Sequence, residues 1–212
     1  MDKHNFKVSI IDDDLEITEG LALLLKSYNY HVSSYNNIEQ FIKNENYDGA
    51  GCILLDVFLE GKTSLELQEV IETKFESQPI IFISGQGNVP MSVEALKKGA
   101  INFLEKPIDE QALVKALDEA LSRSAELITK NKELDRIRAL MNTLTAREYE
   151  ILRYVISGML NKQIAAELGI AEHTIKNHRL NITDKLKVKS VAELVNIADK
   201  LSIKGVSVNN SS

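Results

Sequence analysis

Five polar residues in the first half of the chain stand at the ends of short apolar runs, and their types suit chemistry on a phosphoryl group. Asp12 and Asp13 follow the run in IIDDD, Asp56 ends the run in ILLDVFLEG, Ser84 follows IIFI, and Lys106 follows NFLE. Close carboxylates repel one another unless a cation neutralises them, and an oxygen-only cluster suits Mg²⁺. A metal ion and an ammonium can then neutralise phosphoryl oxygens while one carboxylate attacks phosphorus.

These residues meet only if the apolar runs form neighbouring strands of one sheet. Strand candidates recur at five places: Phe6–Ile11, His31–Tyr35, Cys52–Leu55, Ile80–Ile83 and Ile101–Leu104. Such alternation of strands with helix-like stretches predicts an α/β fold, with a parallel sheet and helices on both faces. Because ligands bind at the carboxyl ends of the strands in such sheets, we expect Asp56 at the edge of a binding crevice.

The helix-like stretches between the strands are recognised by the spacing of their apolar residues. Residues 15–28 place four of them on one face: Ile17, Leu21, Leu24 and Leu25. Residues 63–75 do the same with Leu65, Leu67, Val70 and Ile71. Asp14 and Glu16 are expected at a helix N-terminus, where the dipole favours acids.

Each candidate site residue has a simpler interpretation when it is taken alone. Asp56 would end a strand and face water, Ser84 would belong to a turn, and Phe103 would belong to the core. The functional interpretation depends on a charged set in one crevice, which rarely has another use. Its members are Asp12, Asp13, Asp56 and Lys106.

Charge and cysteine content separate two parts of the chain. Residues 1–122 carry 21 acidic against 10 basic residues, whereas residues 144–212 carry 10 basic against 7 acidic ones. This asymmetry indicates two roles, because only the mildly basic part suits contact with nucleic acid. Cys52 is the single cysteine, so a disulfide within the chain is excluded. No signal peptide or membrane-spanning stretch is recognised, and we expect a cytoplasmic protein without membrane contact.

The motifs IIDDD, ILLD, FISGQGN and FLEKP, in this order, resemble the receiver domain of two-component response regulators, over residues 6 to about 122, and residues 1–122 are assigned to this domain. The resemblance implies a flavodoxin-like, doubly wound sheet with strand order 2-1-3-4-5, and phosphorylation by a sensor histidine kinase. It implies that Asp56 is the phospho-acceptor. Mg²⁺ ligands are implied at Asp12 (through water), Asp13, Asp56 and the main-chain oxygen of Phe58. Phosphoryl-binding and switch roles are implied for Ser84, Phe103 and Lys106, with a cis Lys106–Pro107 bond.

The loop after the phospho-acceptor departs from the usual receiver pattern. Glu60 stands where proline is usual, and Ser64 stands where glycine is usual. The sequence leaves open how these two residues affect the geometry of the loop and the lifetime of the phosphoryl group. Metal binding should survive, because Phe58 contributes only a main-chain oxygen.

Residues 123–143 are interpreted as a helical linker within a helical pattern that runs from Asp109 to about Met141 without Pro or Gly. Apolar residues recur at spacings near three, four or seven, with Ser124 and Asn131 interrupting them: Leu113, Leu117, Ala120, Leu127, Leu134 and Met141. Two interpretations stay open. The helix forms a coiled-coil seam, or it packs onto its own receiver and continues as a solvated connector.

Residues 144–212 read as a small all-α domain that ends in the polar tail VSVNNSS. Thr145 and Glu148 form a capping box, Gly158 ends that helix, Asn161 caps the next, and Gly169 ends it. Two short helices joined by a tight turn predict a helix-turn-helix. The second presents long polar side chains suited to a major groove, namely Lys176, Asn177, His178, Arg179, Asn181 and Lys185.

The segments LTAREYEIL and GMLNKQIAAELGIAEHTIKNH resemble the LuxR-type helix-turn-helix, and the whole chain resembles FixJ- and NarL-like regulators. The resemblance implies base contacts from Lys176, Asn177 and Leu180. It implies DNA-backbone contacts from Lys162, Thr174 and Arg179. It makes the last helix a dimer contact through Val191, Leu194, Val195 and Ala198, although packing within the domain explains these residues equally well.

The resulting hypothesis is a transcription factor, not an enzyme, in which phosphorylation of Asp56 promotes homodimers that bind double-stranded DNA. An alternative keeps DNA binding but makes the first domain a sensor of a protein or small molecule that takes no phosphate. An enzyme, such as a phosphatase, is disfavoured because nothing in the sequence supplies a substrate pocket or a second catalytic group.

Overall fold

The computed structural model describes residues 6–47, 49–59, 62–85 and 89–206. The chain forms two compact units, residues 1–130 and residues 131–212. Glu60, residues 86–88 and residues 207–212, which include most of the polar tail, lie outside the described residues. Within the described residues, no helix combines the length and the apolar character needed to cross a membrane.

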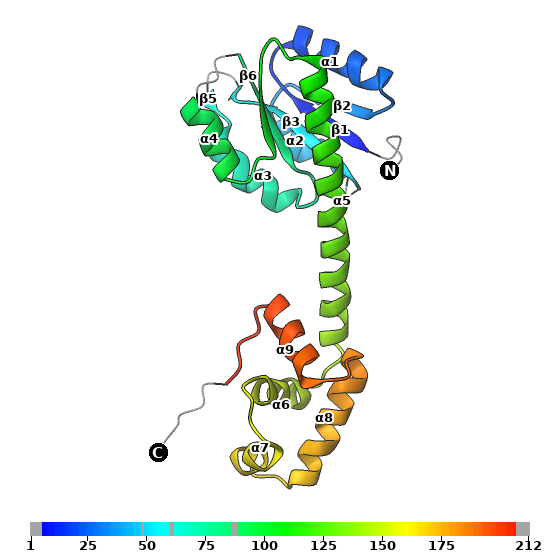
Figure 1. Cartoon of the computed structure of the whole chain (residues 1–212), viewed down its shortest axis with the longest axis vertical. Coiled ribbons are helices and arrows are strands. Elements are labelled where there is room, and N and C mark those ends of the chain that lie inside the picture. The colour runs from blue at the N-terminus through cyan, green and yellow to red at the C-terminus, as the bar shows by residue number, and fades with distance from the viewer. Residues whose placement is uncertain (1–5, 48, 60–61, 86–88, 207–212) are drawn as a thin grey trace. The chain divides into compact units, whose positions relative to one another are not determined.

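The first unit is built on a five-stranded parallel sheet with the order β2-β1-β3-β6-β7 (Figure 1). Its strands are β1 (Lys7–Ile11), β2 (His31–Tyr35), β3 (Gly51–Asp56), β6 (Ile80–Ser84) and β7 (Asn102–Glu105). Each agrees with an expected strand to within one or two residues. Since β6 and β7 are the fourth and fifth strands of this sheet, the predicted order 2-1-3-4-5 is confirmed.

Both faces of the sheet are covered by helices, which explains why its central strands are continuous apolar runs. Helices α1 (Leu15–Ser27) and α5 (Glu110–Met141) cover one face, where the buried residues include Leu21, Leu25, Leu113 and Leu117. Helices α2 (Ile38–Asn44), α3 (Gln68–Lys74) and α4 (Val89–Lys97) cover the other face. Asp14 caps α1 by accepting hydrogen bonds from the main-chain N–H groups of Glu16 and Ile17, as expected.

The helix expected over residues 63–75 is wrong in its start and in its apolar face. The small hairpin β4 (Phe58–Leu59) and β5 (Lys62–Thr63) comes first, followed by the 3-10 helix η2 (Leu65–Leu67) and then α3. Three residues per turn in η2 shift the phase of the helix. Leu65, Gln68 and Ile71 are therefore buried, whereas Leu67 and Val70 are 40% and 53% exposed.

Helix α5 is continuous, as predicted, and its first part belongs to the core of the first unit. Leu113, Leu117 and Ala120 are fully buried there, so these positions pack onto their own sheet rather than form a seam with another chain. Ser124 is also fully buried. Its hydroxyl donates to the Ser77 carbonyl at 2.5 Å and accepts from the Gly51 N–H at 3.0 Å.

The second unit is a helical domain with helices α6 (Ala146–Ile156), α7 (Asn161–Leu168), α8 (Glu172–Leu186) and α9 (Val191–Lys200). The capping box of Thr145 and Glu148 is confirmed, as are left-handed glycines after α6 and α7. Asn161 is not a cap. It is the first residue of α7, and the Gln163 side chain instead accepts from the main-chain N–H of Leu160.

Helix α9 uses most of its apolar face inside its own domain. Leu194 and Ala198 are buried, Val195 is half-buried, and Val191 is 41% exposed. Intradomain packing therefore accounts for Leu194 and Ala198. Ile137 and Met141, at the end of α5, join the same core.

Candidate functional site

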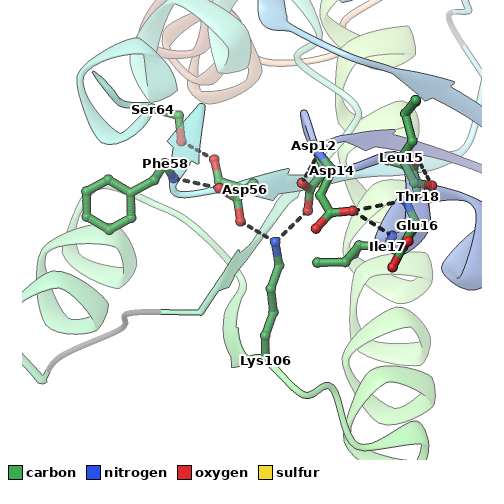
Figure 2. A network of polar contacts seen from close by, with 10 residues as sticks. All are labelled: Asp12, Asp14, Leu15, Glu16, Ile17, Thr18, Asp56, Phe58, Ser64 and Lys106. Carbon is green, nitrogen blue, oxygen red and sulfur yellow. Dashed lines mark hydrogen bonds and ion pairs between the residues drawn. The ribbon is translucent and has the colours of Figure 1, made fainter. Parts of the chain in front are cut away.

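Asp56 is the last residue of β3, at the carboxyl edge of the sheet, and its side chain is held at both oxygens (Figure 2). Its Oδ1 lies 2.7 Å from Nζ of Lys106, and its Oδ2 accepts a hydrogen bond from the Phe58 N–H at 2.8 Å. The residue is only 5% exposed. The expectation of a water-facing strand end is thereby excluded, and the carboxylate is held in one orientation.

Asp12 shares the same ammonium. Its Oδ2 lies 2.7 Å from Nζ of Lys106, and its Oδ1 accepts from the Asp14 N–H at 3.0 Å. Lys106 thus bridges two nearly buried carboxylates that come from the ends of neighbouring strands. Asp13 is exposed and contributes to neither of these ion pairs.

Burial and charge act in opposite directions on these groups. Burial raises the pKa of Asp56, and the ammonium of Lys106 offsets only part of that rise, so the pKa stays above its ordinary value. For Lys106, burial alone would lower the pKa, but hydrogen bonds to Asp12 and Asp56 outweigh it and raise the pKa. Lys106 is therefore a firmly charged group that faces two acids.

The expected switch residues lie on the strands beside Asp56. Ser84 is fully buried at the end of β6, and its carbonyl accepts from the Lys106 N–H at 2.8 Å. Phe103 lies on β7 and is half-buried against the core on the α2–α4 face. The Lys106–Pro107 bond is cis, as the resemblance implied.

The donors at this edge suit a hard cation. Asp12 and Asp56 converge, Asp13 follows in the chain, and the main chain of Phe58 adjoins Asp56. Mg²⁺ binds to one or two carboxylates and keeps several waters, so it does not need a complete protein cage. The donor chemistry fits Mg²⁺. In the described part of the chain, no group of three or more acids, histidines and cysteines is arranged so that it could hold a metal ion by itself.

Ser64 makes a contact that the sequence did not reveal. Its hydroxyl donates to the Asp56 carbonyl at 2.5 Å, and the side chain is almost fully buried (Figure 2). The sequence marked Ser64 only as a departure from glycine. Its partner lies eight residues earlier, and no local pattern specifies that partner.

The candidate nucleic-acid interface lies on α7 and α8. Lys162, Lys176, Asn177 and Leu180 are exposed, whereas Thr174 and Arg179 are half-buried. Leu180 is 60% exposed, so the core does not account for this large apolar side chain. Arg179 donates to Oδ1 of Asn161 at 2.7 Å, which fixes its guanidinium beside the start of α7.

Two residues expected on the polar face of α8 turn inward instead. Lys185 makes a 2.6 Å ion pair with Glu148, whose side chain is 4% exposed, and this pair joins α8 to α6. Burial alone would raise the pKa of Glu148, but hydrogen bonds from Lys185 and Thr145 lower it. His178 is half-buried, with a buried Nδ1. Lys185 is therefore a structural residue of this domain.

Comparisons with known proteins agree with both parts of this description. The family described as response regulator receiver domain matches residues 8–118, and the family described as bacterial regulatory proteins, luxR family, matches residues 142–198. The response regulator protein TmoT of Ectopseudomonas mendocina is 37% identical over 190 residues, which cover 90% of this chain and 86% of TmoT. The transcriptional regulatory protein FixJ of Azorhizobium caulinodans is 36% identical over 188 residues, covering 89% of each.

Solved structures extend the similarity over both units. The structure of the response regulator StyR has a TM-score of 0.71 and 41% identity, and the match covers 92% of this chain and 99% of StyR. Full-length FixJ from B. japonicum has a TM-score of 0.53 and 30% identity, with 93% and 97% covered. The chain belongs to the two-component response regulators that combine a receiver domain with a LuxR-type helix-turn-helix, and it is a transcription regulator rather than an enzyme.

Proposed function

We propose that phosphorylation of Asp56 by a sensor histidine kinase activates this regulator, and that phosphorylated chains pair to bind double-stranded DNA. The observation that carries the proposal is the single ammonium of Lys106, which lies 2.7 Å from a carboxylate oxygen of both Asp12 and Asp56. The ammonium of Lys106, beside two nearly buried acids, can neutralise part of the negative charge that a phosphoryl group brings to this edge of the sheet. This proposal assigns residues 1–122 to the receiver, 123–143 to the linker and 144–212 to DNA binding.

Phosphoryl transfer requires one oxygen of Asp56 to bond to phosphorus while the bond from phosphorus to the kinase histidine breaks. The Phe58 N–H and Lys106 hold the carboxylate in position before reaction, which reduces the cost of orientation. Asp12, Asp13, Asp56 and the Phe58 carbonyl are the proposed Mg²⁺ donors. The chemistry that Mg²⁺ supplies, when bound, is neutralisation of charge on the phosphoryl oxygens.

We propose that Ser84 and Phe103 change conformation when Asp56 is phosphorylated, because both lie on the strands that follow Asp56 across the sheet. The adjacent helix α4 exposes three large apolar residues, Val89 at 76%, Val93 at 42% and Leu96 at 46%. Their spacing of four and three puts them on one helix face. An exposed apolar stripe supports a protein contact, and we propose this face as the pairing surface.

Pairing explains how a small helix-turn-helix domain with few basic residues gains affinity for DNA. Once one helix-turn-helix is bound, the second binds intramolecularly, and the gain can reach roughly 10² to 10⁴. The DNA site should then contain two half-sites related by a dyad. We propose base contacts from Lys176, Asn177 and Leu180, and backbone contacts from Lys162, Thr174 and Arg179. A regulator of bacterial DNA acts in the cytoplasm, which is the proposed location.

The test combines acetyl phosphate, Mg²⁺ and intact-mass measurement. Wild type should gain one phosphoryl group, whereas Asp56→Asn should gain none and keep its fold. Asp14→Asn is the matched control, because Asp14 caps α1 and makes no ion pair with Lys106. Labelling of Asp56→Asn would refute the assignment. An unlabelled wild type would favour the alternative in which the receiver senses a ligand without phosphorylation.

Pairing is tested separately by light scattering with and without beryllofluoride. Binding is compared on a duplex with one half-site and on a duplex with two, after selection of the sequence from a random pool. Activated protein should double in mass and should gain affinity mainly for two half-sites. A monomeric mass with a rise in DNA affinity would refute pairing and favour release of a covered reader helix at residues 173–185.

A further inference from the structure

Ser64 closes the loop that follows the phospho-acceptor. The loop leaves β3 at Asp56, forms the hairpin β4–β5, and returns at Ser64. There the Ser64 N–H donates to the Val57 carbonyl at 2.8 Å, and the Ser64 hydroxyl lies 2.5 Å from the Asp56 carbonyl. The hydroxyl oxygen is also 3.2 Å from the Val57 carbonyl. A hydroxyl has one proton, so the shorter contact is its hydrogen bond.

We infer that Ser64 is a positioning residue for the phospho-acceptor, an inference that rests on the proposed function. The peptide unit between Asp56 and Val57 is held at both ends. Its N–H donates to the Ile83 carbonyl on β6 at 2.8 Å, and its C=O accepts from Ser64. Fixing this peptide unit fixes the direction in which the Asp56 side chain leaves the strand.

The same contact constrains the residue that orients the carboxylate. Phe58 follows the fixed peptide unit, and its N–H donates to Oδ2 of Asp56 at 2.8 Å. If the Asp56–Val57 peptide rotates, that N–H moves away from the carboxylate. One hydroxyl therefore acts on both the main chain and the side-chain orientation of Asp56. Ser64 touches no reacting atom and acts only through Asp56.

Backbone conformation does not account for serine at this position. Ser64 has φ −84° and ψ −6°, which any residue adopts, so glycine is not required here. Glycine and alanine both lack the hydroxyl. Threonine keeps the hydroxyl, and Ser64 borders a cavity with Leu59, Ile38 and Leu67. Threonine should therefore retain the hydrogen bond, and alanine should not.

The experiment uses the full-length protein and Mg²⁺ as the probe of the Asp56 carboxylate. Binding is measured without a phosphodonor, from the amide NMR shifts of Val57 and Phe58. Phosphoryl uptake from acetyl phosphate is then measured as a function of Mg²⁺ concentration. The variants are Ser64→Ala, Ser64→Gly and Ser64→Thr. Thr63→Ala is the matched control, since the Thr63 hydroxyl accepts from the Leu65 N–H at 3.3 Å rather than contacting Asp56.

Loss of one net hydrogen bond should raise the Mg²⁺ dissociation constant by about two- to tenfold in Ser64→Ala. The Mg²⁺ concentration for half-maximal uptake should rise by the same factor, while the rate at saturating Mg²⁺ stays within about twofold. Ser64→Thr should restore both values, and Thr63→Ala should leave them unchanged. If the alanine variant does not fold, Ser64→Gly provides the same comparison.

Three results would overturn the inference. They are an unchanged Mg²⁺ dependence in a folded Ser64→Ala or Ser64→Gly variant, no restoration by a folded Ser64→Thr, and an equal shift in Thr63→Ala. Failure of the proposed function has a different signature. In that case wild type binds Mg²⁺ and loses affinity on Ser64→Ala, yet takes no phosphoryl group.

Discussion

Lys106→Met tests whether one ammonium keeps Asp12 and Asp56 compatible with the folded receiver. Methionine is also unbranched and one atom shorter, and it removes the charge. Asp12 and Asp56 are 1% and 5% exposed, and both acids face Nζ of Lys106 at 2.7 Å. Without that cation, no positive charge among the described residues balances the two nearly buried carboxylates. The variant should therefore lose folding free energy, and added Mg²⁺ should restore much of it.

The expected loss follows from the geometry of the pair. Removing one partner of a buried ion pair costs about 3 to 5 kcal/mol, and the low end applies here because the Lys106 side chain is 17% exposed. Lys98→Met is the matched control. Lys98 pairs with Glu94 at 2.7 Å, but both side chains are over 40% exposed, so this loss should stay below about 1 kcal/mol.

The pH dependence has a defined sign. Burial already raises the pKa of Asp56, and removal of Lys106 raises it further. An acid whose pKa is raised in the folded state favours folding as pH falls. The loss of folding free energy in Lys106→Met should therefore become smaller at lower pH. In wild type, the raised pKa of Lys106 means that its contribution persists until alkaline pH.

Hydrogen exchange of peptides from β1 and β3 is a suitable assay, because it reports the free energy of opening of this unit within the full chain. Exchange is compared between pH 5 and pH 8, with and without Mg²⁺. A loss in Lys106→Met that is equal to that in Lys98→Met would refute the reasoning. So would a larger loss that neither Mg²⁺ nor acid reduces.

Three further predictions concern α5, the α6–α8 contact and the DNA interface. Ser124→Ala should lower the free energy of opening of β3, measured by hydrogen exchange, by about 1 to 3 kcal/mol, because the buried Gly51 N–H loses its acceptor. Glu148→Gln should lower the free energy of unfolding by about 1 kcal/mol, since the Lys185 side chain is a third exposed. This difference from wild type should vanish as pH falls through the lowered pKa of Glu148. Lys176→Ala should weaken specific binding by about 1 to 3 kcal/mol, whereas Arg179→Ala should weaken specific and random DNA alike.

The strands and the order of the site residues were predictable because each depends on a local pattern. Buried parallel strands need continuous Val, Ile and Leu runs, and the carboxyl ends of neighbouring strands meet at one edge. Asp12, Asp56 and Lys106 consequently meet as expected. The assignment of the phospho-acceptor and of the DNA contacts stays a prediction, because it came from resemblance to a family.

The contacts that were missed join residues far apart in sequence or interrupt a regular period. The turn η2 shifted the apolar face of α3, and helix α2 was not foreseen. The Ser64 hydroxyl and the Glu148–Lys185 pair depend on how loops and helices return to one another. Composition and periodicity say which side chains need burial or a partner. They do not specify the partner.

In helix α5 the spacing of apolar residues likewise does not specify whether the partner is the helix's own sheet or a second chain. Apolar residues at spacings of three, four and seven suit a coiled-coil seam and also suit a helix that packs on a sheet. Leu113 and Leu117 are fully buried against their own sheet, and Ser124 bonds two main-chain groups of the same unit. These positions are already occupied and cannot also pair two chains. Pairing through the receiver therefore needs a surface with exposed apolar side chains, which α4 presents at Val89 and Leu96.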